Sequence, residues 1–140
     1  NGNNDNYGIQ IATRSYTNRI ENNTIRTVGS GATNIGILFT TALLNNNITG
    51  NRINTNGTSD NYGIRLITDV NNTVIDNNNI TTAGTGASNY GIDLVTRVSL
   101  NNVTNNVINT SGTTILPSSC CFPIIFLVSL FITNPVSLCS

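Results

Sequence analysis

A chain of 140 residues suits a single domain, and its composition is strongly biased, with 27 Asn and 21 Thr but no His, Met or Trp. Its six cations are all Arg, they balance six acids, and charged residues make up only 9% of the chain. Nucleic acid is therefore not an expected partner, since binding phosphate requires a basic face. The absence of His removes the commonest metal ligand and proton shuttle. We expect no cofactor.

In chain order, the first informative feature is a motif that recurs four times. It begins at Tyr7, Ile35, Tyr62 and Tyr90, in steps of 28, 27 and 28 residues, and reads aromatic or Ile, Gly, Ile, variable, large apolar. Self-similarity at such a period indicates a solenoid. Residues 1–6 are polar, and Asp5-Asn6 match the residues that precede later copies, such as Asp60-Asn61, so we expect further coils of the same parent chain to be partners of this segment.

Aligned copies give apolar columns at strand spacing. Within the motif, apolar residues alternate with variable ones, which is typical of a strand with one buried face. The columns comprise Ile9, Ile37, Ile64 and Ile92; Ile20, Ile48, Ile75 and Val103; and Ile25, Ile53, Ile80 and Ile108. The spacing predicts three short strands per coil and leaves no room for a helix. We therefore predict an all-β, right-handed parallel β-helix of about four coils over residues 1–113.

Polar residues and glycines recur in columns as well. Stacked coils place equivalent residues ~4.8 Å apart, the separation at which side-chain amides bond along a ladder. We predict two Asn ladders, Asn6, Asn34, Asn61 and Asn89 before each first strand, and Asn23, Asn51, Asn78 and Asn106 between the second and third strands. A Thr ladder is expected at Thr27, Thr55, Thr82 and Thr110. Positive φ or close backbone approach is expected at Gly29, Gly57, Gly84 and Gly112.

Two segments carry a family resemblance. Ile20–Ile25 (IENNTI) and Ile75–Ile80 (IDNNNI) resemble the parallel β-helix repeat of pectate-lyase-like proteins, most closely the Asn-rich, NosD-like branch. The resemblance covers about residues 5–113. It implies a right-handed β-helix and a saccharide laid along its outer face. Leucine-rich repeats and a left-handed β-helix remain weaker alternatives, because the chain lacks Leu columns and a hexapeptide rhythm.

The acids are paired with cations and not with one another. Asp93 falls in the outward column of Arg65, and Asp69 falls in the column of Arg97, each one coil away. We expect surface ion pairs worth ~0–1 kcal/mol each, and these four residues are our candidates for outer-face ligand contacts. Asp69 and Asp93 lie four positions apart along the strand, roughly 13 Å, beyond the ~5–9.5 Å of glycosidase carboxylates. We predict no catalytic residue and no metal site.

The tail, residues 114–140, is a different kind of sequence. The columns fail from Ile115, a short apolar run covers residues 120–132, and all three Cys (Cys120, Cys121 and Cys139) lie after residue 119. An odd number of Cys gives no complete disulfide framework, and the run is shorter than the ~20 residues of a membrane span. Three interpretations stay open: a cap on the solenoid, an anchor, or an unselected remnant. Membrane contact is expected only if the tail is an anchor.

The function expected from these features is structural or binding. We expect a non-catalytic β-solenoid segment of a secreted or surface protein, extracellular or cell-surface in location. The resemblance implies a polysaccharide or cell-surface glycan as its partner. The alternative is a fragment of a polysaccharide lyase or hydrolase whose catalytic coils lie outside this chain.

Overall fold

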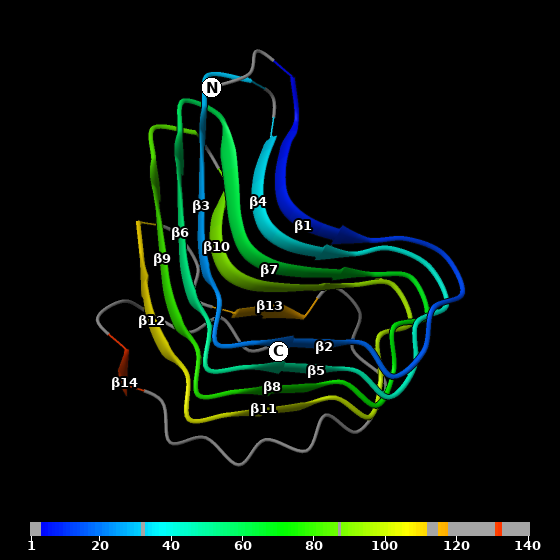
Figure 1. Cartoon of the computed structure of the whole chain (residues 1–140). Coiled ribbons are helices and arrows are strands. Elements are labelled where there is room, and N and C mark those ends of the chain that lie inside the picture. The colour runs from blue at the N-terminus through cyan, green and yellow to red at the C-terminus, as the bar shows by residue number, and fades with distance from the viewer. Residues whose placement is uncertain (1–3, 32, 87, 112–114, 118–130, 133–140) are drawn as a thin grey trace.

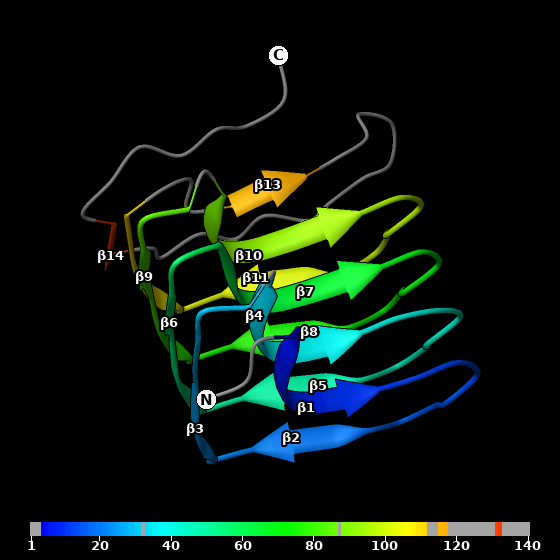
Figure 2. The same cartoon turned by 90° about the horizontal axis from the view of Figure 1, so that it is seen from above.

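The chain winds into a right-handed parallel β-solenoid of about four coils (Figures 1 and 2). This computed structural model describes residues 4–31, 33–86, 88–111, 115–117 and 131–132, and within them every regular element is a strand. The predicted fold is confirmed. We call β1–β3 coil 1, β4–β6 coil 2, β7–β9 coil 3 and β10–β12 coil 4.

Each coil contributes one strand to each of three parallel sheets. The first sheet contains β1 (Asn6–Ile11), β4 (Thr33–Phe39), β7 (Asp60–Ile67), β10 (Asn89–Val95) and β13 (Ile115–Pro117). The second contains β2 (Arg19–Glu21), β5 (Asn47–Thr49), β8 (Val74–Asp76) and β11 (Asn102–Thr104). The third contains β3 (Thr24–Gly29), β6 (Arg52–Gly57), β9 (Asn79–Gly84), β12 (Val107–Thr110) and β14 (Phe131–Ile132).

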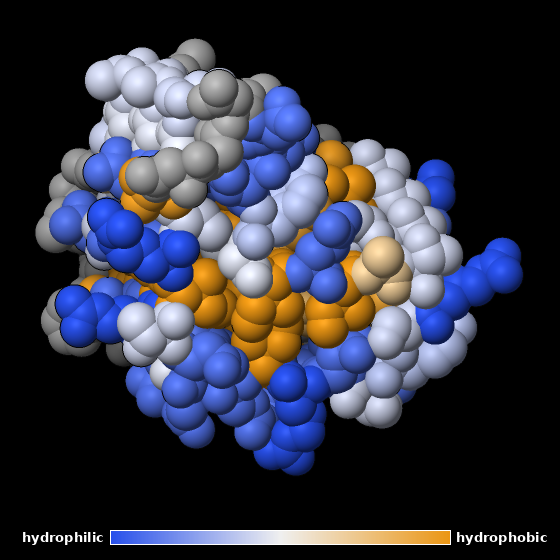
Figure 3. Space-filling view, turned by 45° about the horizontal axis from the view of Figure 1, so that its top comes forward, coloured by the Kyte–Doolittle hydropathy of each residue, from blue (hydrophilic) through white to orange (hydrophobic). Residues whose placement is uncertain are grey.

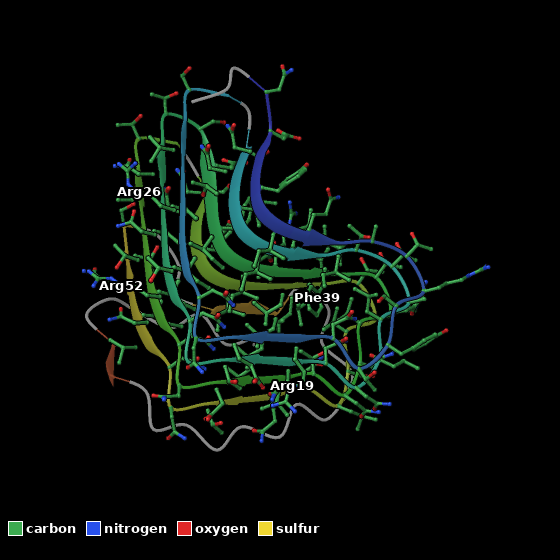
Figure 4. The ribbon with its side chains drawn as sticks, in the orientation of Figure 1. Arg19, Arg26, Phe39 and Arg52 are labelled. Carbon is green, nitrogen blue, oxygen red and sulfur yellow. The ribbon has the colours of Figure 1, made fainter. Side chains whose placement is uncertain are left out.

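The apolar columns form the core in the predicted register. Ile37 pairs with Ile64, and Ile64 with Ile92, and all three side chains are fully buried. Phe39 also lies inside the coils, whereas Arg19, Arg26 and Arg52 lie outside (Figure 4). A further core column comes from the corner between the first and second strands and was not predicted: Leu43, Val70 and Val98.

The first sheet bends sharply, so that the solenoid has an L-shaped cross-section (Figure 1). Residue pairing between β4 and β7 runs from Ile35–Tyr62 to Ile37–Ile64 and leaves out the glycines between them. A Cβ on Gly36 would overlap Cγ2 of Ile53 and the carbonyl oxygen of Gly63. Glycine is therefore required here by space, because this leg of the first sheet packs directly against the third sheet.

Three corner columns in each coil take the left-handed conformation. They begin in coil 1 with Arg14, Thr17 and Asn22, whose φ values are 58°, 56° and 57°. In coils 1 to 3 the backbone N–H at each of these corners donates to a carbonyl of the next coil, as Asn22 does to Thr49 at 3.0 Å. Most of these residues are not glycine, and for a residue with a Cβ the left-handed conformation costs roughly 1–2 kcal/mol. The hydrogen bonds between coils offset this cost.

In the column of Gly29, glycine is required because neighbouring atoms approach the backbone closely, and not because φ is positive. A Cβ on Gly57 would overlap the side-chain amide of Asn34 and the carbonyl oxygen of Gly29, and Gly84 repeats the arrangement one coil on. Neither glycine is among the residues with positive φ. The predicted fourth member, Gly112, lies outside the described residues.

Both predicted Asn ladders form. In the first, Nδ2 of Asn6 donates to Oδ1 of Asn34 at 3.1 Å, and the bonds continue through Asn61 to Asn89 at 3.2 and 2.8 Å. In the second, each Oδ1 accepts from both the backbone N–H and the Nδ2 of the preceding coil: Asn23 to Asn51, Asn51 to Asn78, and Asn78 to Asn106. From coil 2 onward these amides are buried.

The Thr column is buried, but only some of its hydroxyl groups form hydrogen bonds. Thr82 donates to Oγ1 of Thr110 at 2.5 Å, and Thr110 donates to the carbonyl of Asn89. Thr27 and Thr55 have buried hydroxyls without a hydrogen-bond partner among the described residues. This column therefore contributes packing in coils 1 and 2 and hydrogen bonding in coils 3 and 4.

Two pieces of the tail continue the sheets. Residues of β13 pair with β10, with Ile92 beside Ile115, and β14 pairs with β12, with Ile108 beside Ile132. Pairing thus extends past the predicted division at 113/114, although the step from Ile92 to Ile115 is five residues shorter than the 28-residue repeat. The apolar run and the three Cys fall outside the described residues except for Phe131 and Ile132. The tail's role stays a prediction.

We expect Ile64→Ala to destabilise the protein by roughly 2–5 kcal/mol, through lost burial and the cavity left behind. The control is Val107→Ala, because Val107 is an exposed β-branched residue on a neighbouring sheet. Urea unfolding measures both. Equal, small losses in the two variants would contradict the core position of Ile64.

We expect Asn51→Ala to cost at least about 2 kcal/mol, because it leaves several buried groups unpaired. The lost bonds are those that Nδ2 donates to Asn78 and Ile20, and those that Oδ1 accepts from Asn23. Asn54→Ala, on the exposed face of β6, the strand that follows Asn51, is the matched control and should change stability by less than about 0.5 kcal/mol. Similar unfolding midpoints for the two variants would show that the ladder contributes little.

Candidate functional site

The concave outer angle of the bent first sheet is the best candidate for a site. We call it the crook, and define it by Ile35, Leu38, Tyr62, Arg65, Ile67, Tyr90 and Asp93. These side chains belong to outward columns of β4, β7 and β10, and they come together because the two legs of each strand meet at an angle (Figure 1). Apolar and charged side chains thereby share one surface.

The floor of the crook is apolar. Ile35, Leu38 and Tyr62 are buried in a cluster separate from the main core, and Ile67 and Tyr90 pack partly buried against it. An outward column would normally be exposed, but here the bend brings residues at positions i and i+3 of one strand into contact. The crook is therefore a second, smaller hydrophobic cluster on the outside of the solenoid.

Two aromatic rings and a guanidinium lie over this floor. The Tyr62 and Tyr90 rings have centroids 5.5 Å apart at an interplanar angle of 41°. Cζ of Arg65 lies 4.3 Å from the centroid of the Tyr62 ring, within the range of a cation–π interaction. The Arg65 side chain stays 26% exposed, so it links the buried aromatic cluster to solvent.

Arg65 is paired with Asp93, as predicted, but the prediction of a surface pair is wrong for Asp93. Nε of Arg65 lies 2.8 Å from Oδ2 of Asp93, whose side chain is only 4% exposed. Arg65 Nε has no well-aligned hydrogen-bond acceptor among the described residues, so the contact is an ion pair by its distance. Burial raises the pKa of the Asp93 carboxyl, and Arg65 offsets part of that rise. Asp93 is buried because the sheet bends over it and because Leu116 of β13 pairs beside it.

Asp69 and Arg97 form the exposed pair that was predicted. Nε and Nη2 of Arg97 donate to the two carboxylate oxygens of Asp69 at 2.7 and 2.8 Å. Both residues occupy the left-handed corner column, with φ of 60° and 55°, so their side chains project together from adjacent coils. The hydrogen bond from Arg97 lowers the pKa of the Asp69 carboxyl. This pair lies at the corner beyond β7 and β10, outside the crook.

The remaining acids are dispersed. Glu21 pairs with Arg19 on β2 at 2.9 Å, while Asp76 accepts hydrogen bonds from Thr104 and Asn105. Across the described ranges no group of three His, Cys, Asp or Glu side chains is placed to hold a metal ion. In the same residues no helix has the length and apolarity needed to cross a membrane.

An open groove of about 440 Å³ lies elsewhere, over the corner that follows the third sheet. Its lining residues come from three successive coils and are Val28, Gly29, Ser30, Asn56, Gly57, Thr58, Gly84 and Thr85. None of them is charged or aromatic. We favour the crook as the site, because the bend of the strands brings two aromatic side chains and a partly exposed guanidinium together.

Sequence reasoning missed one ladder and the crook. A third ladder runs through Asn18, Asn46, Thr73 and Asn101: Asn18 donates to Asn46, Asn46 donates to Thr73, and the Thr73 N–H donates to Asn101. Its steps of 28, 27 and 28 residues match the motif, but the Thr and the abundance of Asn nearby conceal it. For the crook, the available signal was the Gly that follows the outward Tyr or Ile in every copy of the motif.

Comparison with protein-family models, curated proteins and solved structures finds no match to this chain. Its architecture is shown by the coordinates alone: a parallel β-solenoid with three sheets and buried Asn and Thr ladders.

The buried Asp93 carboxyl predicts a specific pH dependence of stability. Because its folded pKa lies above the unfolded value near 3.8, the folded state binds more protons between the two values. The contribution of Asp93 to stability therefore rises as the pH falls through the folded pKa, and levels off below the unfolded one. Asp93→Asn should remove this contribution, as measured by urea unfolding between about pH 3 and pH 7.

The matched control is Asp69→Asn, because the contribution of Asp69 to stability changes with pH in the opposite direction. The folded pKa of Asp69 is lowered, so its contribution is present above the unfolded pKa and is lost as the pH falls through the folded one. An Asp93→Asn variant with the same pH profile as the parent protein would contradict the burial of this carboxylate.

Proposed function

We propose that this chain is a rigid, non-catalytic β-solenoid segment of an extracellular or cell-surface protein, and that its crook binds a saccharide. One observation carries the proposal: a column of aromatic side chains, buried at Tyr62 and partly exposed at Tyr90, lies with the partly exposed Arg65 along the axis of the solenoid. The ladders and the dry core keep the coils in fixed register, which suits a surface that a linear ligand follows.

The groups left accessible match the chemistry of a sugar ring. Tyr7, which continues the aromatic column of the crook into coil 1, is 40% exposed, and Tyr90, one coil beyond Tyr62, is partly exposed. A pyranose has an apolar face and a rim of hydroxyls, which suit aromatic faces with a few directional polar groups beside them. Arg65 supplies such donors, and the exposed Gln10 lies in its column.

Charge favours an uncharged saccharide. Asp5 accepts a hydrogen bond from the Tyr7 hydroxyl at 3.1 Å, and Asp60 and Asp93 both act electrostatically on Tyr62. Against these three carboxylates the crook offers the single cation Arg65, which is already paired. An acidic polysaccharide would meet net repulsion, so we propose a neutral glycan as the ligand.

The family assignment belongs to the same proposal. The three-sheet solenoid and its Asn ladders support membership of the pectate-lyase-like superfamily, and the IENNTI and IDNNNI segments favour its NosD-like branch. Family membership adds to the case for a saccharide but does not carry it. The case rests on the crook.

One observation favours the alternative, a fragment of a polysaccharide-active enzyme. A buried carboxyl with a raised pKa in a concave site is what a general acid requires, and Asp93 has both properties. Its ion-pair partner is Arg65, however, and Asp69 is held by Arg97 at a corner outside the crook. Turnover of a neutral glycan that is lost in Asp93→Asn would establish this alternative in place of a binding role.

A glycan array, followed by titration calorimetry on the best ligand, tests the binding role. We expect binding to neutral glycans, weakened about tenfold or more in Tyr7→Ala, since a tenfold change corresponds to ~1.4 kcal/mol of lost contact. Tyr16→Ala is the matched control, because Tyr16 is 55% exposed at the corner before the second sheet and lies outside the crook. Equal weakening in the two variants, or binding to acidic glycans alone, would contradict the proposal.

A further inference from the structure

The solenoid has one end at which three strands are all unpaired on the same side. β1, β2 and β3 are the outermost strands of the first, second and third sheets, and all three belong to coil 1 (Figure 2). Each therefore presents a row of backbone groups without strand partners among the described residues. Unpaired edges of this kind are a template for adding another strand.

This end lacks two of the features by which proteins usually protect a sheet edge, Pro and inward-facing charge, although β2 is short and carries Arg19 and Glu21. Residues 4–31 contain no Pro, and the inward-facing side chains are Ile9, Ile11, Ile20, Ile25 and Thr27, which carry no charge. Ile9 and Ile11 are only partly buried, whereas their counterparts in coils 2 and 3 are fully buried. Figure 3, which views this end obliquely, shows apolar atoms gathered within a hydrophilic rim. The end resembles an interior interface more than a finished surface.

The amide ladders have a direction. In all three ladders the side-chain amide of one coil donates to the oxygen of the following coil, as Asn6 does to Asn34, Asn18 to Asn46 and Asn23 to Asn51. The left-handed corners follow the same rule, because Arg14, Thr17 and Asn22 donate their N–H to carbonyls of coil 2. At the Asn positions Oδ1 therefore accepts from the preceding coil and faces back along the axis, while Nδ2 of Asn51 and of Asn78 also donates back, to the carbonyls of Ile20 and Ile48.

The open end is therefore an acceptor surface at its ladder positions. Oδ1 of Asn6 and Oδ1 of Asn23 accept no hydrogen bond from the residues that the structure describes, and Oδ1 of Asn18 accepts only one, from Ser15. Between these Asn positions, the open end also presents backbone N–H donors. In coil 2 the N–H groups of Asn47 and Arg52 donate back to carbonyls of coil 1, so the equivalent N–H groups in coil 1 face the open side. Those equivalents belong to Arg19 and Thr24.

The other end of the solenoid differs. Beyond coil 4, β13 pairs with the first sheet and β14 with the third. β13 contains Pro117, which lacks an N–H and so weakens the edge as a template. A second copy stacked head to tail would meet these strands, not the bare face of a coil. If two coil 1 ends were placed face to face, the Asn Oδ1 acceptors of one ladder would face the Oδ1 acceptors of the other.

We propose that the coil 1 end is an interface for one more parallel coil, which carries Asn, or an equivalent side-chain amide donor, at the positions before Asn6, Asn18 and Asn23. This coil continues the interface already repeated three times between coils 1 and 4. Its Nδ2 groups bond to the three Asn oxygens, its carbonyls accept from Arg19 and Thr24, and its apolar side chains cover Ile9 and Ile11. The inference goes beyond the proposed function, and it holds whatever ligand the crook takes.

The test extends the full chain by one coil. A duplicate of residues 34–60, the chain's own second coil, is placed directly before Asn6, which aligns the copies of Asn34, Asn46 and Asn51 with Asn6, Asn18 and Asn23. Hydrogen exchange should slow about tenfold or more at the amides of Arg19 and Thr24, because they gain partners. The dependence of the unfolding free energy on urea should rise by about a quarter, since five coils would unfold in place of four.

The matched control changes the three copied Asn residues to Asp. The Asp side chain has the size and the acceptor oxygens of Asn but no N–H to donate. The added coil precedes a chain that folds without it. We expect this control to lose the protection at Arg19 and Thr24. Equal protection with Asp, or no protection with Asn, would overturn the proposal. Self-association of the parent chain that protects the same two amides would also overturn it, because the occupant would then be a second copy.

Discussion

The structure depends on hydrogen bonding between coils, because the backbone–backbone hydrogen bonds of each coil of about 28 residues are made with neighbouring coils. Each strand pairs only with the coil before it and the coil after it, and the buried Asn amides bond the same way, through Oδ1 and Nδ2 in a fixed direction. Burying an amide without partners costs several times what one hydrogen bond contributes. The ladders therefore hold the register, since a slip of one residue would leave every amide in a column unpaired. They also permit the left-handed corners, where Thr, Arg and Leu adopt a conformation that they would otherwise avoid.

A second constraint comes from glycine in the first sheet. The column through Gly36 and Gly63 has no room for a Cβ, because the strand lies against Ile53 and Ile80 of the third sheet. The sheet bends at this close contact, and the bend turns two outward columns toward each other. A surface that would have been flat and exposed becomes a concave one, with a small hydrophobic cluster at its base. The aromatic rings, the Arg65 guanidinium and the Asp93 carboxylate owe their proximity to this geometry.

The two ion pairs show how much the bend changes. Both consist of Arg and Asp one coil apart in the same column. Asp69 and Arg97 project from a corner into solvent, where the carboxyl pKa is lowered. Asp93 lies within the crook, where burial outweighs the attraction of Arg65 and its pKa is raised. The same pairing thus gives a screened surface contact in one place and a buried, perturbed carboxyl in the other. A solenoid can in this way place distinct chemistry on neighbouring columns without changing its core.

The sequence alone was sufficient for the solenoid, its three strands per coil, the Ile columns and two Asn ladders, because each of these repeats at the period of the chain and depends only on what lies one coil away. It also identified both charge pairs by their shared columns. The third ladder through Asn18 and Thr73 was hidden because its chemistry changes from amide to hydroxyl midway. The crook and the burial of Asp93 depend on contacts across the bend, and on the pairing of β13 with β10, neither of which follows the repeat. Only the tertiary structure decided the crook and the burial of Asp93. The period of the sequence determines which residues stack on one another from coil to coil, whereas the path of the backbone within a coil determines which columns come into contact.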